Sequence, residues 1–97
     1  MSYQVKIDRK ANRFYHSLDA KSRRIVKNHL DMLREDPYPG SPGDKEKLAL
    51  PGGEMTYRMH IGRTFTVFYD IDNERSIVFI NILTTIEDAH KRYGRWA

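Results

Sequence analysis

The chain is 97 residues long, contains no cysteine and carries a formal net charge of +4. A chain of this length has room for one hydrophobic core, so we expect a single domain over residues 1–97. Without cysteine it forms no disulfides or thiolate metal sites, and no apolar run approaches the roughly 18 residues of a membrane span. Because residues 1–10 also lack the apolar segment of a signal peptide, we expect a soluble cytoplasmic protein without membrane contact.

The positive charge is concentrated in the N-terminal third. Residues 1–34 hold 9 Lys and Arg against 3 Asp and Glu, whereas residues 54–97 hold 6 of each kind. A basic field of this size favours encounters with polyanions, which indicates a nucleic-acid or acidic-protein partner. A solvated helix face rich in Lys and Arg explains the same pattern equally well.

The first half of the chain predicts a short strand and two helices. Residues 3–7 alternate between apolar and polar, and a spacing of three to four between apolar residues then indicates helices over 9–17 and 20–35. Asp8 and Asp19 are placed to cap these helices at their N-termini. The proline at position 37 ends the second helix and begins an irregular loop.

The second half predicts three consecutive strands joined by tight turns. Apolar and polar residues alternate over 55–61 and again over 64–72, which is typical of half-buried strands. Residues 76–83 are almost continuously apolar, which indicates a strand that is covered on both faces and is therefore central in the sheet. Asn73 supplies hairpin chemistry between the last two strands, because Asn tolerates positive φ. Two further elements are an extra edge strand near Leu48 and a tail after residue 83 that is helical or extended, with Thr85 as its cap.

This order of elements predicts an α+β fold. An N-terminal strand and a helical hairpin pack on one face of a mainly antiparallel sheet of four or five strands. The other face of the sheet is expected to stay open. Arg58 and His60, two residues apart on one strand, project to that open face because successive strand residues alternate.

The open face is therefore the candidate site, and its expected side chains are cationic, imidazole and phenol groups. These are Arg58, His60, Arg63, His90, Lys91 and Tyr93. RNA cleavage by its own 2′-hydroxyl needs this mixture, because a base removes the 2′-OH proton, cations stabilise the phosphorane and an acid protonates the leaving oxygen. The alternative is that the cations only keep the surface soluble and that Tyr93 closes the end of the core. The four histidines show no metal-type spacing, so no metal site and no cofactor are expected.

Four features of the chain resemble the RelE/ParE superfamily of type II toxins. They are the strand Tyr-Arg-Met-His-Ile-Gly-Arg over 57–63, the Thr-Val-Phe-Tyr-Asp-Ile run over 66–71, the apolar strand that follows and a terminal Tyr93. The resemblance extends from Tyr3 to Tyr93. It implies a compact microbial-RNase-like fold and a cognate, RelB-like antitoxin as partner. It also implies one of two activities, since the RelE branch cuts mRNA in the ribosomal A site without metal and the ParE branch inhibits DNA gyrase.

Carried over by position, the two basic strand residues of the family fall on Arg58 and His60, and the C-terminal tyrosine falls on Tyr93. Two positions that usually hold arginine fall on Thr66 and Glu87 instead. Arg63, together with His90 or Lys91, would have to replace that charge from neighbouring positions.

The leading hypothesis is a ribosome-dependent mRNA endonuclease, an mRNA interferase that inhibits translation. Its phosphate and RNA contacts would be Arg58, Arg63 and Lys91, with His60 or His90 as base or acid and Tyr93 orienting or deprotonating the 2′-OH. The helix residues Arg23, Arg24 and Lys27 would meet ribosomal RNA, an interaction that weakens with salt. The alternative is a non-nucleolytic, ParE-like inhibitor of DNA gyrase, or a catalytically inactive relative that binds an antitoxin or nucleic acid.

Overall fold

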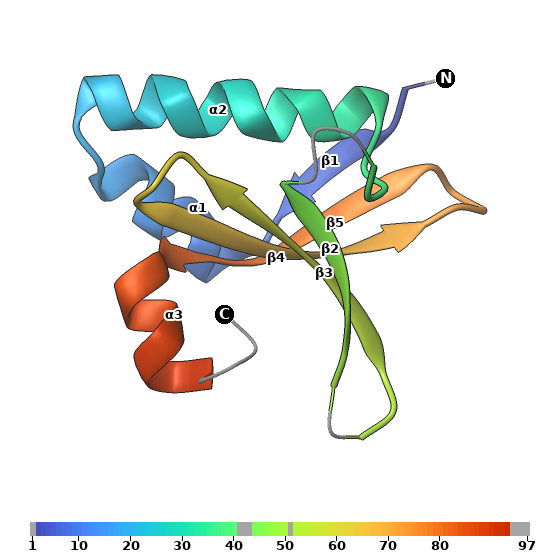
Figure 1. Ribbon diagram of the computed structural model, residues 1–97. Helices are drawn as coiled ribbons and strands as arrows, with labels where there is room; N and C mark the ends of the chain where they lie inside the picture. Colours follow the sequence, from blue (N-terminus) through green and yellow to red (C-terminus); the bar gives the residue numbers. More distant parts are fainter. Residues whose placement is uncertain (1, 41–43, 51, 94–97) are drawn as a thin grey trace.

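The computed structural model describes residues 2–40, 44–50 and 52–93. Within these ranges the chain forms three helices and five strands (Figure 1). In chain order they are β1 (Gln4–Ile7), α1 (Arg9–Ser17), α2 (Ala20–Glu35), β2 (Lys45–Ala49), β3 (Met55–Ile61), β4 (Phe65–Asp72), β5 (Ile77–Thr85) and α3 (Ile86–Tyr93). None of the helices in the described ranges is long and apolar enough to cross a membrane.

The five strands form one mixed sheet in the order β1-β5-β4-β3-β2. Strand β1 pairs parallel with β5, and the other three pairs are antiparallel. The expected α+β class and the mainly antiparallel sheet are therefore confirmed, and the extra strand near Leu48 is present as the edge strand β2. Strand β5 is not the central strand that its apolar run predicts, because β1 pairs beside it at the edge and β4 takes the central position.

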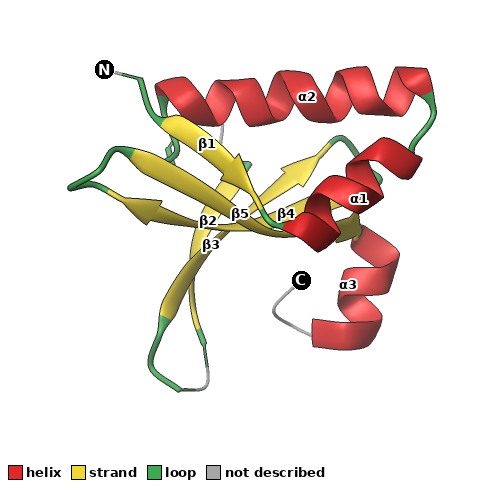
Figure 2. Ribbon diagram, turned by 180° about the vertical axis from the view of Figure 1, so that it is seen from behind, coloured by secondary structure: helices red, strands yellow, loops and turns green. Residues whose placement is uncertain are grey.

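Helices α1 and α2 pack together on one face of the sheet, as the two ribbon views show (Figures 1 and 2). Each helix begins at a predicted cap: the Asp8 carboxylate accepts from the backbone N–H of Lys10, and the Asp19 carboxylate accepts from that of Ser22. The core between the two layers consists of fully buried side chains from both helices and from the inward positions of the strands. Among them are Val26, Leu33, Met59, Ile61, Val67, Val78 and Ile80.

The opposite face of the sheet is not fully open, which corrects the expectation from the sequence. Helix α3 leaves the end of β5 and covers part of this face, which we call the α3 face (Figure 1). Ala89 and Tyr93, one helical turn apart, pack against Phe68 of β4 in a second, smaller apolar cluster. The Thr85 cap predicted from the sequence is present, because its hydroxyl accepts from the N–H of Asp88 at 3.0 Å. The tail is thus a helix up to residue 93.

The pairing of β4 with β5 contains an irregularity that the sequence pattern does not predict. Phe68 pairs with Ile82, but the next residue, Tyr69, pairs with Ile80, so Asn81 is an extra residue on β5. A bulge of this kind turns two successive residues toward the same face. The turn between the two strands also differs in detail from expectation, because the residue with positive φ is Ser76, at 56°, and not the asparagine.

Candidate functional site

Arg58 and His60 lie on the α3 face, as the alternation of β3 predicts. Their neighbours Met59 and Ile61 are buried against the helices on the other face. In the β3–β4 pairing Arg58 stands opposite Phe68 and His60 stands opposite Thr66, so all four side chains share one face.

The Arg58 guanidinium is held by Glu46 of the edge strand β2. The two residues are directly opposite in the β2–β3 pairing, and their side chains form an ion pair. The Arg58 side chain is only 16% exposed, whereas that of Glu46 is 53% exposed. Burial lowers the pKa of the Arg58 guanidinium, but the group stays charged at neutral pH.

Tyr93 is brought to the same surface by α3. Its ring meets that of Phe68 edge to face, with 5.5 Å between the centroids. Since Phe68 is the β4 partner of Arg58, the structure connects Arg58, Phe68 and Tyr93 across adjacent elements. The structure thus places three of the predicted site residues, Arg58, His60 and Tyr93, on the same face of the sheet.

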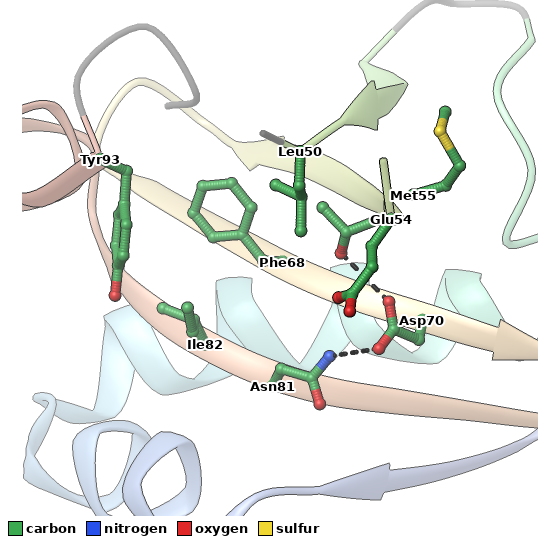
Figure 3. A pocket seen from close by; sticks show the side chains of 9 residues that line it. Leu50, Glu54, Met55, Phe68, Asp70, Asn81, Ile82 and Tyr93 are labelled. Carbon is green, nitrogen blue, oxygen red and sulfur yellow. Dashed lines mark hydrogen bonds between the residues drawn. The ribbon is translucent and has the colours of Figure 1, made fainter. Parts of the chain in front are cut away.

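A groove of about 460 Å³ opens on the α3 face between the β2–β3 hairpin and α3 (Figure 3). Its apolar lining includes Phe68 and Ile82, and its polar lining includes the carboxylates of Glu54 and Asp70. The described residues that line it, which define the α3-face groove, are Leu50, Glu54, Met55, Thr56, Phe68, Asp70, Asn81, Ile82 and Tyr93.

The polar end of this groove is a hydrogen-bonded network around Asp70. The amide Nδ2 of Asn81 donates to Asp70 Oδ2 at 2.8 Å, and the hydroxyl of Thr56 lies 3.1 Å from Asp70 Oδ1 (Figure 3). Sequence reasoning missed these residues. The polar position of Asp70 within an apolar strand was the available signal for it, whereas the pairing of β4 with β5 that brings Asn81 beside it depends on strand register.

The other predicted residues of the site are placed differently. Arg63 is exposed in the β3–β4 turn, close along the chain to His60. His90 is exposed on α3. Lys91 lies two residues from both Ala89 and Tyr93, so it occupies the opposite side of α3 from the one that packs on the sheet. It forms an ion pair with Glu87 at 3.6 Å, and both side chains are largely exposed.

The three basic residues of α2 are on the other side of the sheet from Arg58. The Nζ of Lys27 forms an ion pair with Asp31 at 2.9 Å, and Arg23 reaches the carbonyl oxygen of His16 at 3.5 Å. Arg24 is exposed. A ligand that contacts Arg58 and these helix residues together would have to span both faces of the domain (Figure 2).

Neither of the two positions where the family resemblance predicts arginine, 66 and 87, holds a cationic side chain. Thr66 is fully buried, and its hydroxyl donates to the carbonyl oxygen of Met59 at 3.4 Å. Glu87 is exposed and negatively charged. Among residues 2–40, 44–50 and 52–93, no group of three or more His, Asp or Glu side chains is arranged to hold a metal ion.

Comparison with known families identifies the chain. Residues 5–89 match the model of the ParE toxin of the parDE type II toxin–antitoxin system. The chain belongs to this family. A search of curated proteins finds no match.

Solved structures of RelE toxins share the fold. The toxin is 27% identical, with a TM-score of 0.72, to a chain of the archaeal RelE–RelB complex from Pyrococcus horikoshii OT3, and the match covers 88% of this chain and 96% of that one. For the RelBE2 toxin–antitoxin complex from Mycobacterium tuberculosis the values are 22% identity, a TM-score of 0.71, and 88% and 99% coverage. A mutant of the E. coli toxin RelE in the free state is 21% identical with a TM-score of 0.61, and the match covers 93% of this chain and 90% of that one. The protein is thus a type II toxin of the RelE/ParE superfamily.

Proposed function

We propose that this toxin is a ribosome-dependent, metal-independent mRNA endonuclease that stops translation in the cytoplasm. The observation that carries the proposal is the position of Arg58 and His60 on the α3 face, beside the Phe68–Tyr93 contact. A cation, an imidazole and a phenol on one face of the sheet supply the groups that transesterification by a 2′-hydroxyl requires. The 27% identity with an archaeal RelE over most of both chains supports the same branch.

In this mechanism Arg58 and Arg63 hold the scissile phosphate, and Lys91 contacts RNA further along α3. His60 or His90 takes the 2′-OH proton or protonates the departing 5′-oxygen, while Tyr93 orients the 2′-OH or removes its proton. Arg58 must exchange the carboxylate of Glu46 for the phosphate, since an ion pair already occupies it in the free protein. Arg23, Arg24 and Lys27 contact ribosomal RNA from the helical face. No metal or other cofactor takes part.

A second candidate is a non-nucleolytic toxin that inhibits DNA gyrase, or a catalytically inactive relative. Buried Thr66 and negative Glu87 stand where arginines are expected, and Glu46 holds Arg58. Each missing phosphate donor removes roughly 3 kcal/mol of transition-state stabilisation, so two losses without replacement would stop cleavage. The family model that matches the chain is that of ParE, which agrees with this alternative.

The partners in the first proposal are the ribosome, its bound mRNA and a cognate antitoxin. The antitoxin follows from the family, because a type II toxin is one half of a toxin–antitoxin pair. The related structures from Pyrococcus horikoshii and Mycobacterium tuberculosis are toxin–antitoxin complexes of this kind.

Primer extension on a translated mRNA tests the proposal. The wild type is induced in parallel with the triple variant Arg58→Ala/His60→Ala/Tyr93→Phe and with Arg75→Ala as a control. Arg75 is a matched cation, 75% exposed in the β4–β5 turn and remote from β3 in the strand pairing. We expect cuts inside codons with the wild type and the control, but none with the triple variant, and loss of all cuts when translation is blocked.

Growth arrest with intact mRNA would reject the endonuclease. The same toxin proteins are then purified and tested for inhibition of DNA gyrase, measured as supercoiling of relaxed plasmid. Inhibition by the wild type and the triple variant alike, together with its loss on charge reversal of Arg23, Arg24 and Lys27, would establish the second candidate.

A further inference from the structure

The α3-face groove has a charge opposite to that of the protein that contains it. The sequence has a net charge of +4, yet the charged side chains that line the groove are the carboxylates of Glu54 and Asp70. Both lie at one end of the groove (Figure 3). No lysine or arginine within the described ranges forms an ion pair with either of them. Two carboxylates at one end of a groove make that end negative, so it attracts a cation.

Asp70 is held in place as an acceptor. Asn81 donates to one carboxylate oxygen at 2.8 Å, and the Thr56 hydroxyl lies 3.1 Å from the other. A carboxylate has about four acceptor positions, so each oxygen keeps one for a further donor. Asn81 lies on the same face as Asp70 because Phe79, the β5 partner of Asp70, precedes it by two residues and side chains of a strand alternate.

Glu54 is positioned by the β2–β3 hairpin. Its carbonyl oxygen accepts from the N–H of Leu50 at 2.7 Å, which closes the hairpin beside the groove. The Leu50 and Glu54 side chains both line the groove, together with Met55, which is 47% exposed. The hairpin therefore supplies one charged and two apolar contacts on the side opposite α3.

The rest of the lining suits the stem of a long basic side chain. Phe68 and Ile82 form an apolar strip between the acidic end and Tyr93 (Figure 3). Arginine and lysine bury their aliphatic stems along such surfaces while the charged head reaches a polar group. The volume of about 460 Å³ has room for one such side chain and an apolar neighbour.

We propose that the α3-face groove binds a segment of the cognate antitoxin that inserts an arginine or lysine between Glu54 and Asp70. An apolar residue next to that cation packs on Leu50, Met55 and Phe68. A protein segment is favoured over RNA because the two carboxylates repel phosphate and attract a basic side chain. The inference rests on the antitoxin partner proposed above, but it does not depend on RNA cleavage.

Calorimetric titration of the purified toxin with its cognate antitoxin is the first test. Glu54→Gln and Asp70→Asn each remove one charge at nearly constant shape. Each should weaken antitoxin binding about tenfold, since a charge-assisted hydrogen bond is lost. Glu74→Gln, an exposed carboxylate in the β4–β5 turn, is the matched control and should bind like the wild type.

A probe pair separates the groove from the rest of the antitoxin interface. ¹⁵N-labelled toxin is titrated with acetyl-Leu-Arg-Leu-amide and with acetyl-Leu-Gln-Leu-amide, and NMR shifts are followed at Phe68, Asp70 and Asn81. We expect saturable shifts at these residues with the arginine peptide and at least fivefold weaker binding of the glutamine peptide. This readout also covers the case in which Asp70→Asn fails to fold.

Three outcomes would overturn the inference. Wild-type toxin that binds no antitoxin would reject the partner itself. Antitoxin binding that is unchanged in both charge-removing variants would reject only the groove. Stronger shifts at Phe68 and Asp70 with a short oligoribonucleotide than with the arginine peptide would assign the groove to RNA instead.

Discussion

The ion pair between Glu46 and Arg58 leads to a prediction about the rate of RNA cleavage. If Arg58 holds the scissile phosphate, Glu46 competes with the substrate for the same guanidinium. Glu46→Gln removes the competing charge but leaves a side chain of the same size on β2. This variant should therefore cleave translated mRNA faster than the wild type.

The size of the effect follows from the exposure of the pair. Glu46 is 53% exposed, so solvent screens the interaction, and pairs of this kind contribute at most about 1 kcal/mol. Relief of about 1 kcal/mol corresponds to roughly a fivefold increase in kcat/KM, given that 1.4 kcal/mol is tenfold. By contrast, Arg58→Ala should lower kcat/KM by about 100-fold or more, as expected when a donor to the transition state is removed.

The assay is cleavage of a defined mRNA on ribosomes in a reconstituted translation system, with kcat/KM measured for the three proteins. Glu74→Gln is the control for a general change in net charge. Slower cleavage by Glu46→Gln would refute the reasoning, because Glu46 would then hold Arg58 in its productive position. Equal rates for the wild type, Glu46→Gln and Arg58→Ala would remove Arg58 from the mechanism altogether.

Three further predictions concern stability and are measured by urea unfolding. Leu33→Ala empties a fully buried position of α2 and should lower the unfolding free energy by about 2–5 kcal/mol; a smaller loss would mean that the core collapses around the cavity. Tyr69→Phe deletes the buried hydrogen bond to the Pro37 carbonyl oxygen, 2.7 Å long, and should cost about 1–3 kcal/mol. Burial raises the pKa of the Tyr69 phenol, so above about pH 10 the phenol loses its proton in the unfolded state before it does so in the folded state. The unfolding free energy of the wild type should therefore fall more steeply with pH than that of Tyr69→Phe. Parallel plots of unfolding free energy against pH would contradict this. A hydrogen bond from Ser22 lowers the pKa of Asp19, so the stabilisation by this carboxylate is present above the ordinary Asp pKa and is lost as pH falls through the folded-state pKa. Asp19→Asn should therefore lose less unfolding free energy on acidification than the wild type, which a series of unfolding curves at different pH would test.

Most secondary structure was predictable because it depends on neighbours along the chain. The spacing of apolar residues and the aspartate caps placed α1 at Arg9–Ser17 and α2 at Ala20–Glu35, as observed. Alternation placed β3 at Met55–Ile61 and correctly put Arg58 and His60 on the face away from the two helices. The pairing of β1 with β5 was not predictable in the same way, since it joins residues about 73 apart, such as Gln4 and Ile77.

The candidate site was predictable only in part. The strand residues Arg58 and His60 and the terminal Tyr93 all lie on the α3 face. Lys91 does not join them, because the helical turn that packs Ala89 and Tyr93 on the sheet leaves it on the outer side of α3. Whether Arg63, His90 or the basic residues of α2 contact RNA stays a prediction.

The sequence by itself determined the local elements, the face that each strand residue occupies and the family, since periodicity, caps and motifs are properties of short segments. Only the tertiary structure decided that Glu46 stands opposite Arg58, that α3 covers part of the second face and that Asn81 turns beside Asp70. These contacts depend on strand register and on how a helix packs on the sheet. A shift of one residue in pairing reverses every side chain of a strand, and short segments carry no information about which register the complete core selects.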